Sequence, residues 1–141
     1  MVIYPLEEIA GRLKIEEGWS PTIYQCSQGK WTLGFGRNVD PTGPGITEAE
    51  GEILLKNDIE RTIDELRTTF SWCDKLDPSR AAVLTEIAFQ MGLTTLRQFK
   101  LMLSALAQGD HDEAANQLLS SRYAKQVPAR AARYAERLSG F

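Results

Sequence analysis

The sequence contains little histidine and little cysteine, and this scarcity excludes several kinds of active site. The single histidine, His111, stands in a polar run, so we expect neither a Ser-His-Asp relay nor a zinc site built from several histidines. The two cysteines, Cys26 and Cys73, form no CxxC motif and have no metal-ligand spacing. We expect both to be free thiols, as in a reducing cytoplasm.

Long apolar segments are missing as well. No hydrophobic run approaches the roughly 20 residues that span a bilayer, and the N-terminus shows no basic region followed by an apolar core. We therefore expect no stable membrane insertion, and synthesis in a cytoplasm without a secretory signal. The net charge is −3, which argues against a nucleic-acid-binding surface, although the C-terminal segment is basic.

What remains is the composition of one globular domain: 141 residues, 43% hydrophobic and 25% charged. The spacing of apolar residues predicts an α+β, predominantly α fold. We expect a small lobe of helix and β-hairpin over about residues 12–55, a larger all-helical lobe over about 70–141 that includes the first helix, and a long helix joining them. The predicted helices cover about 6–17 and 47–70, then follow Asp77, span 96–108, and follow Asp110 and Pro128.

Three side chains with useful chemistry, Glu17, Cys26 and Thr32, lie in one short stretch. The pattern predicts a helix end at Glu17, followed by strands over 22–25 and 30–35 that are joined around Gly29. Glu17 is at the edge of the apolar stripe of the first helix, where partial desolvation favours the protonated acid. Cleavage of a glycosidic bond needs such an acid and a second group for the oxocarbenium ion or the attacking water. Without the hairpin, Glu17 would be interpreted as an exposed residue at a helix end.

This stretch resembles the phage-type lysozymes, the endolysins of glycoside hydrolase family 24. Their motif is a Glu, eight residues, an Asp or Cys, five residues and a Thr, which Glu17, Cys26 and Thr32 match without a gap. The resemblance extends over nearly the whole chain and implies a lysozyme-like fold. The residues that carry it further are Gly18, Tyr24, Gly29, Gly34 and Gly36, with the segments 46–50, 89–92 and 128–133.

The resemblance implies a role for each site residue. Glu17 is the general acid, and Thr32 orients the water or the sugar. Cys26 holds the position more often occupied by Asp, and either attacks the anomeric carbon or stabilises the oxocarbenium ion and activates water. Arg130 pairs with the catalytic glutamate across the lobes, and Gln90 faces the cleft.

Two further residues are candidates for contact with the sugar. Tyr24 is an aromatic that could pack against a sugar ring, and Gly34 leaves room for the substrate to approach the backbone. One departure from the family pattern follows Gly36, where Arg37 stands in place of a common histidine. The fold-stabilising role of that histidine is therefore absent or replaced.

The function implied by the resemblance is that of a bacteriolytic hydrolase. Its substrate is bacterial peptidoglycan, cut at the β-1,4 bond between N-acetylmuramic acid and N-acetylglucosamine. We expect a monomer that needs no metal or organic cofactor, binds no nucleic acid, and reaches the wall in the periplasm through a holin during host lysis by a phage.

Three other interpretations remain open. A lytic transglycosylase uses one glutamate and no water, and leaves 1,6-anhydromuramic ends, but the spacing of Cys26 and Thr32 argues against it. A glycan-binding domain that has lost catalysis requires Cys26 to be inert. A helical nucleic-acid binder could use the basic last helix, yet the acidic remainder makes this the weakest alternative.

Overall fold

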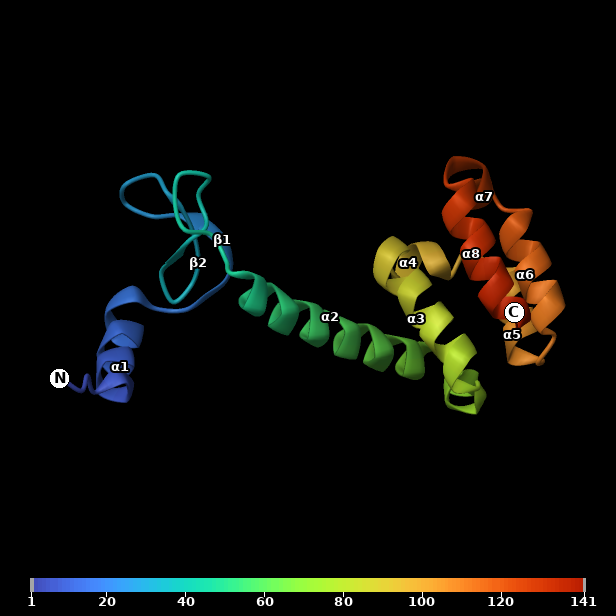
Figure 1. The fold of residues 1–141 in the computed structure, drawn as a ribbon, viewed down its shortest axis with the longest axis horizontal. Coiled ribbons are helices and arrows are strands. Elements are labelled where there is room, and N and C mark those ends of the chain that lie inside the picture. The colour runs from blue at the N-terminus through green and yellow to red at the C-terminus, as the bar shows by residue number, and fades with distance from the viewer. Residues whose placement is uncertain (1, 141) are drawn as a thin grey trace. The chain divides into compact units, whose positions relative to one another are not determined.

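The computed structural model describes residues 2–140 (Figure 1). The chain folds as two compact units, Met1–Glu52 and Ile53–Phe141, whose boundary falls inside helix α2 (Glu48–Thr69). Helices dominate and one small antiparallel sheet accompanies them, so the predicted α+β, predominantly α class is confirmed. Among the described residues, no helix is both long enough and apolar enough to cross a bilayer.

Unit 1 contains helix α1 (Leu6–Glu17) and a three-stranded sheet in the order β1-β2-β3. The hairpin of β1 (Ser20–Gln25) and β2 (Trp31–Gly34) is the predicted one, whereas the short β3 (Arg37–Asn38) had no strand-like pattern in the sequence. The hairpin turn closes when the Gly29 N–H donates to the Cys26 carbonyl at 2.8 Å. Gly29 has φ +76°, a left-handed conformation that explains the glycine.

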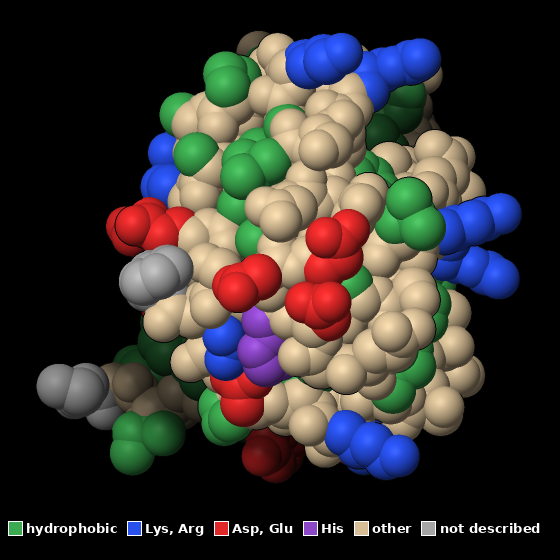
Figure 2. Space-filling view, turned by 90° about the vertical axis from the view of Figure 1, so that its right-hand side faces the viewer, with side chains coloured by type: hydrophobic (Ala, Val, Ile, Leu, Met, Phe, Trp, Pro, Cys, Tyr) green, Lys and Arg blue, Asp and Glu red, His purple; other side chains and the backbone are tan. Residues whose placement is uncertain are grey.

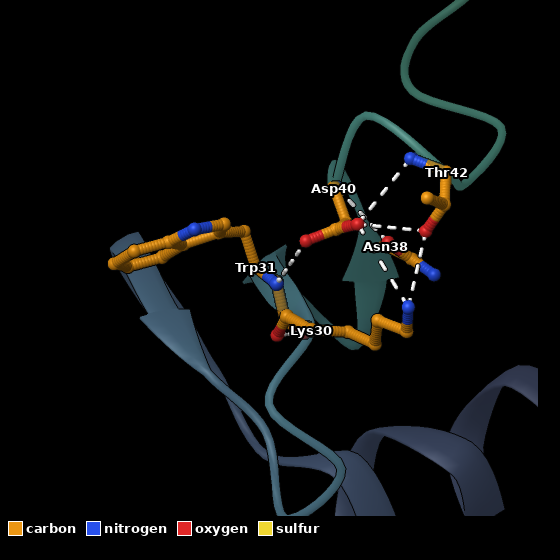
Figure 3. Close-up of polar contacts among 6 residues, drawn as sticks. Lys30, Trp31, Asn38, Asp40 and Thr42 are labelled. Carbon is orange, nitrogen blue, oxygen red and sulfur yellow. Dashed lines mark hydrogen bonds and ion pairs between the residues drawn. The ribbon is translucent and has the colours of Figure 1, made fainter.

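The loop that follows β3 in the sequence is held by the side chain of Asp40 (Figure 3). Its carboxylate accepts hydrogen bonds from the Thr42 hydroxyl at 2.7 Å and the Thr42 N–H at 3.3 Å, and also from the Trp31 N–H at 3.5 Å. The Lys30 ammonium lies 4.0 Å away. These donors, led by Thr42, hold the pKa of Asp40 below its usual value. The loop is thereby attached to β2, the strand that carries Thr32.

The start of α2 is joined to the sheet by an ion pair. Thr47 and Glu50 form the predicted capping box, with reciprocal hydrogen bonds of 2.9 and 3.1 Å. The Arg37 guanidinium binds the Glu50 carboxylate through its two terminal nitrogens, Nη1 and Nη2, at 2.8 and 2.6 Å. Nη1 also donates to the Gly45 carbonyl at 3.1 Å. Arg37 is the main cause that lowers the pKa of Glu50 to about 2, and the Thr47 N–H adds to it.

Unit 2 consists of helices, and some of them begin at a capping side chain. Asp77 caps α3 (Pro78–Met91) by accepting from the Arg80 N–H at 3.2 Å, and Asp110 caps α6 (His111–Leu119) by accepting from the Glu113 N–H at 3.2 Å. The elements after α2 are η1 (Ser71–Lys75), α3 (Pro78–Met91), α4 (Leu93–Leu96), α5 (Lys100–Ala107), α6 (His111–Leu119), α7 (Arg122–Gln126) and α8 (Pro128–Ser139).

One helix prediction in unit 2 is wrong in its extent. The apolar pattern predicts a single helix over 96–108, but Leu96 ends α4 and a new helix, α5, begins at Lys100. Between them the backbone closes a tighter turn, in which the Gln98 N–H donates to the Thr95 carbonyl and the Phe99 N–H to the Leu96 carbonyl, at 3.0 and 2.9 Å. The apolar periodicity of the sequence continues through this break, so the periodicity could not predict where α4 ends and α5 begins.

The hydrophobic core lies entirely in unit 2 among the residues that the structure describes. Helix α6 packs on both α5 and α8, and α3 packs on α8. Each large core side chain removed from water contributes about 1.5–3 kcal/mol. The largest fully buried side chains are Val83, Leu84, Ile87, Leu96, Met102, Leu106, Leu118 and Leu138.

Candidate functional site

Glu17 is the last residue of α1, and its carboxyl group lies against the turn between β2 and β3. A Cβ atom placed on Gly36 would lie only 2.8 Å from Glu17 Oε2, so the glycine makes the space that this carboxyl group occupies. The rings of Trp19 and Phe35, with centroids 5.0 Å apart, pack together beside the same turn. Glu17 itself is exposed, and α1 buries none of its residues. The apolar stripe of α1 therefore does not desolvate Glu17 within unit 1.

Cys26 and Thr32 are neighbours across the hairpin. Cys26 is a half-buried free thiol, and its pKa is lowered first by the Gln28 and Lys30 N–H groups and further by the Thr32 hydroxyl. Thr32 is 5% exposed, and its hydroxyl donates to the Lys30 carbonyl at 2.9 Å. These donors favour the thiolate, which is the form able to act as a nucleophile or as a stabilising anion.

Tyr24 and Gly34 belong to the same sheet. Tyr24 is half-buried and lies opposite Thr32 in the register of β1 and β2. Gly34 has φ +68°, while a Cβ atom there would meet only the Trp19 ring, at 3.7 Å. A side chain at position 34 would thus be resisted by backbone strain rather than by crowding. Unit 1 therefore contains all five of its predicted site residues: Cys26, Thr32 and Tyr24 are neighbours in the β1–β2 hairpin, whereas Gly34 ends β2 and Glu17 lies against Gly36 in the turn that follows.

The other two predicted site residues, Gln90 and Arg130, are exposed on unit 2. Gln90 lies near the end of α3 and accepts a hydrogen bond from the Tyr134 hydroxyl of α8 through Oε1. Arg130 is one helical turn before Tyr134, close enough for its charge to act on the same hydroxyl. Gln90 and Arg130 are thus grouped around Tyr134.

Tyr134 was missed as a functional candidate by sequence reasoning. It occupies an apolar position of α8, between Ala131 and Leu138, and is 5% exposed. Burial is the main cause that raises its pKa, and Tyr123 and Glu86 add to this, while Arg130 opposes it. The signal in the sequence is that of a core aromatic, and only the packing of α8 on α3 reveals the contact with Gln90.

Unit 2 also contains a large apolar cavity of about 570 Å³. It is lined mainly by hydrophobic side chains of α2 and α3, such as Ile59, Ile63 and Phe89. Its walls include Glu86 and Gln90 but none of the reactive groups of unit 1. An apolar lining of this kind does not by itself supply the acid and the second group that glycoside cleavage requires.

No group of three or more metal-ligating side chains within residues 2–140 is arranged to hold a metal ion. His111 opens α6 beside Asp110, Asp112 and Glu113, which make up the acidic start of that helix. On the face shown in Figure 2, acidic side chains gather near the histidine, Lys or Arg atoms lie directly beside it, and further Lys and Arg side chains lie toward the edges. His111 is therefore a polar residue of the first helical turn.

Comparison with known proteins gives one consistent result. A model of the phage lysozyme family matches residues 14–136. "Probable T4-type lysozyme 1" of Dictyostelium discoideum is 25% identical, over 91% of this chain and 91% of that protein. "Endolysin" of Acyrthosiphon pisum secondary endosymbiont phage 1 is 29% identical, over 80% of this chain and 76% of that protein.

Proposed function

Because this chain belongs to the phage lysozyme family, and is therefore a peptidoglycan hydrolase, we propose that it cleaves the β-1,4 bond between N-acetylmuramic acid and N-acetylglucosamine. The observation that carries this proposal is that the Cys26 thiol and the Thr32 hydroxyl are neighbours in one hairpin, in the same unit that holds the Glu17 carboxyl group against the turn at Gly36. They supply both the acid and the second group that glycoside hydrolysis needs.

In the proposed mechanism, Glu17 protonates the leaving oxygen as the glycosidic bond breaks. The Cys26 thiolate acts at the anomeric carbon of the sugar whose bond breaks, in one of two ways. It either attacks the anomeric carbon, forming a thioglycosyl intermediate that water then hydrolyses, or it stabilises the oxocarbenium ion and helps a water molecule to attack.

Thr32 has a hydroxyl with one proton, so it donates to one acceptor at a time. It donates to the Lys30 carbonyl in the structure, and it also lowers the pKa of Cys26. We propose that this hydroxyl turns toward Cys26 when the thiolate forms, and that it orients the water or the sugar. Tyr24 would pack against a sugar ring, and Gly34 would admit the substrate close to the backbone.

For unit 2 we propose supporting roles. Arg130 would act on Glu17 by its positive charge, and Gln90 would contact the substrate. Replacing Arg130 by alanine should then move the alkaline limb of the pH–activity profile to higher pH, because a nearby cation favours the ionised carboxylate. An unchanged profile would remove Arg130 from the site.

We further propose that the protein acts as a monomer on the cell wall, during host lysis, after a holin has given it access. The proposed reaction uses only groups of the chain and water. The endolysin relative is consistent with this setting. A dependence of lysis on a co-expressed holin, with no lysis by the chain alone in the cytoplasm, would support it; lysis without any holin would contradict it.

The proposed bond specificity can be tested by mass spectrometry of peptidoglycan fragments released by the purified full chain. Hydrolysis at the proposed bond leaves reducing N-acetylmuramic acid ends. Anhydromuramic ends would instead identify a lytic transglycosylase, and reducing N-acetylglucosamine ends would place the cut at the other bond. Binding to walls without any fragments would identify a non-catalytic glycan-binding domain.

A further inference from the structure

Three polar contacts join α3 and α8 along their length. The Arg80 Nε donates to the Leu138 carbonyl at 2.9 Å, and the Arg137 guanidinium binds the Glu86 carboxylate at 2.9 and 2.5 Å. The third contact is the hydrogen bond from the Tyr134 hydroxyl to Gln90 Oε1. In the first two contacts an arginine binds a carbonyl or a carboxylate, whereas the third holds the neutral amide of an exposed glutamine.

In the structure, the hydrogen bond from Tyr134 uses the oxygen end of the Gln90 amide. The Tyr134 hydroxyl has a single proton, and Gln90 Oε1 accepts it. With the amide turned around, Nε2 would instead donate to the phenol oxygen and Oε1 would become the outward end, so the two directions of the amide present opposite chemistry to a ligand. The bonded arrangement leaves the two N–H donors of Nε2 unused by Tyr134, on a side chain that is exposed.

The surroundings of Tyr134 keep this arrangement in place. Its ring is buried in the core, so the hydroxyl has little freedom to move. Burial raises the pKa of Tyr134, and so do the neighbouring Tyr123 and Glu86, which keeps the phenol protonated and able to donate. The Tyr123 hydroxyl is itself buried but makes no hydrogen bond with the described residues, so it takes no part in holding Gln90.

We propose that Tyr134 is a positioning residue, which holds the Gln90 amide with its nitrogen outward so that Gln90 binds a carbonyl oxygen of the substrate. This inference rests on the proposed function, in which Gln90 contacts peptidoglycan. Peptidoglycan offers such oxygens in the acetamido groups of its sugars and in its peptide stems. In either case, the outward end of Gln90 acts as a donor.

Two variants of Gln90 test the direction of the amide. Gln90→Ala removes both ends of the group, and Gln90→Glu keeps an oxygen but removes the N–H donors. If the nitrogen binds the substrate, both variants should raise KM by roughly three- to tenfold, the range expected for one lost hydrogen bond, with kcat within a factor of about two. A Gln90→Glu variant with the parent KM would overturn the proposed orientation.

A double-mutant cycle then tests Tyr134 itself. Tyr134→Phe removes only the hydroxyl and should raise KM by a similar roughly three- to tenfold in the parent, but have no further effect in the Gln90→Ala background. A purely structural role would give the same added effect in both backgrounds, and would overturn the proposal. Tyr123→Phe is the matched control, because it removes a neighbouring hydroxyl that has no partner, and its KM should stay within about twofold of the parent.

The substrates in this cycle should be soluble peptidoglycan oligomers with and without their stem peptides, used with the full-length chain. An effect on both would assign the contact to an acetamido group, and an effect only on oligomers with stems would assign it to the peptide. If the parent turns over neither, the proposed function fails. The same cycle measured as Kd for these oligomers would still decide the role of Tyr134, because coupled losses support it and additive losses contradict it.

Discussion

The two units of the chain differ in what holds them together. Within residues 2–140, every buried hydrophobic side chain lies between Leu66 and Leu138, in unit 2, whereas the buried residue of unit 1 is Thr32, a polar one. Unit 1 is organised instead by hydrogen bonds at Asp40, by the ion pair of Arg37 with Glu50, and by glycines in turns. The proposed reactive groups belong to the unit that has almost no core.

This difference suggests that unit 2 stabilises the fold, whereas unit 1 carries the reactive groups. A packed core resists changes in volume, so a substitution in unit 2 should act mainly on stability. The reactive groups of unit 1 are held by a few polar contacts and are not packed in a hydrophobic core. A substitution of one of them should therefore act mainly on activity. The experiments below would sharpen this contrast or remove it.

The largest effect on stability should come from the core of unit 2. Leu118→Ala empties a site where the side chain is 0% exposed, and should lower the free energy of unfolding by about 2–5 kcal/mol. The neighbouring Leu119 is 49% exposed and provides the matched control, because Leu119→Ala should have a much smaller effect. Denaturant unfolding of both variants gives the comparison, and equal losses would contradict the assignment of the core.

Cys26 should show the opposite behaviour, with a large effect on activity and little on stability. We expect Cys26→Ala to lower the rate of wall lysis by roughly 10²-fold, while Cys26→Asp stays active, because a carboxylate can replace the thiolate. Unfolding midpoints should stay close to that of the parent. Lysis by Cys26→Ala at the parent rate would make Cys26 a simple turn residue.

The second cysteine offers an internal control for the thiol. Burial, together with Asp74, raises the pKa of Cys73, whereas backbone and hydroxyl donors lower that of Cys26. An alkylating reagent should therefore modify Cys26 first and inactivate the parent, but spare the activity of the Cys26→Asp variant. Equal inactivation of both proteins would assign the sensitive thiol to Cys73.

The smallest effect should come from the ion pair at the start of α2. The neighbouring donors lower the pKa of Glu50 from its ordinary value of 4.5 to about 2, so its stabilising contribution is complete above pH 4.5 and is lost as the pH falls through 2. Glu50→Gln should thus lower the Tm at neutral pH, with the difference shrinking below pH 4.5 and vanishing below pH 2. Glu52→Gln changes a nearby exposed glutamate without this ion pair and is the matched control, and a Glu50 difference that stays the same from pH 7 to below pH 2 would contradict this prediction.

The sequence predicted those features that depend on neighbouring residues. The capping residues Thr47, Asp77 and Asp110 mark helix starts that the structure confirms, and the hairpin around Gly29 is present. These signals are local, since each involves a side chain and a backbone group only a few residues away.

The features that were missed depend on contacts between distant segments. The break before Lys100 is invisible to a periodicity that continues across it, and the short strand at Arg37 forms only because β2 is there to pair with it. The contact of Tyr134 with Gln90 joins residues 44 positions apart. In the candidate site, the motif supplied the residue types, but the burial of Thr32 and the donors around Cys26 follow from the folded hairpin.

The central claim is that unit 1 supplies the acid of the reaction, and Glu17→Gln tests it most directly. Glutamine keeps the size of the side chain beside Gly36 but cannot donate a proton to the leaving oxygen. Wall lysis by the variant, followed as loss of turbidity alongside the parent, should fall by roughly 10² or more, with an unchanged unfolding midpoint. Lysis within a factor of a few of the parent, by a variant that is equally folded, would contradict the account.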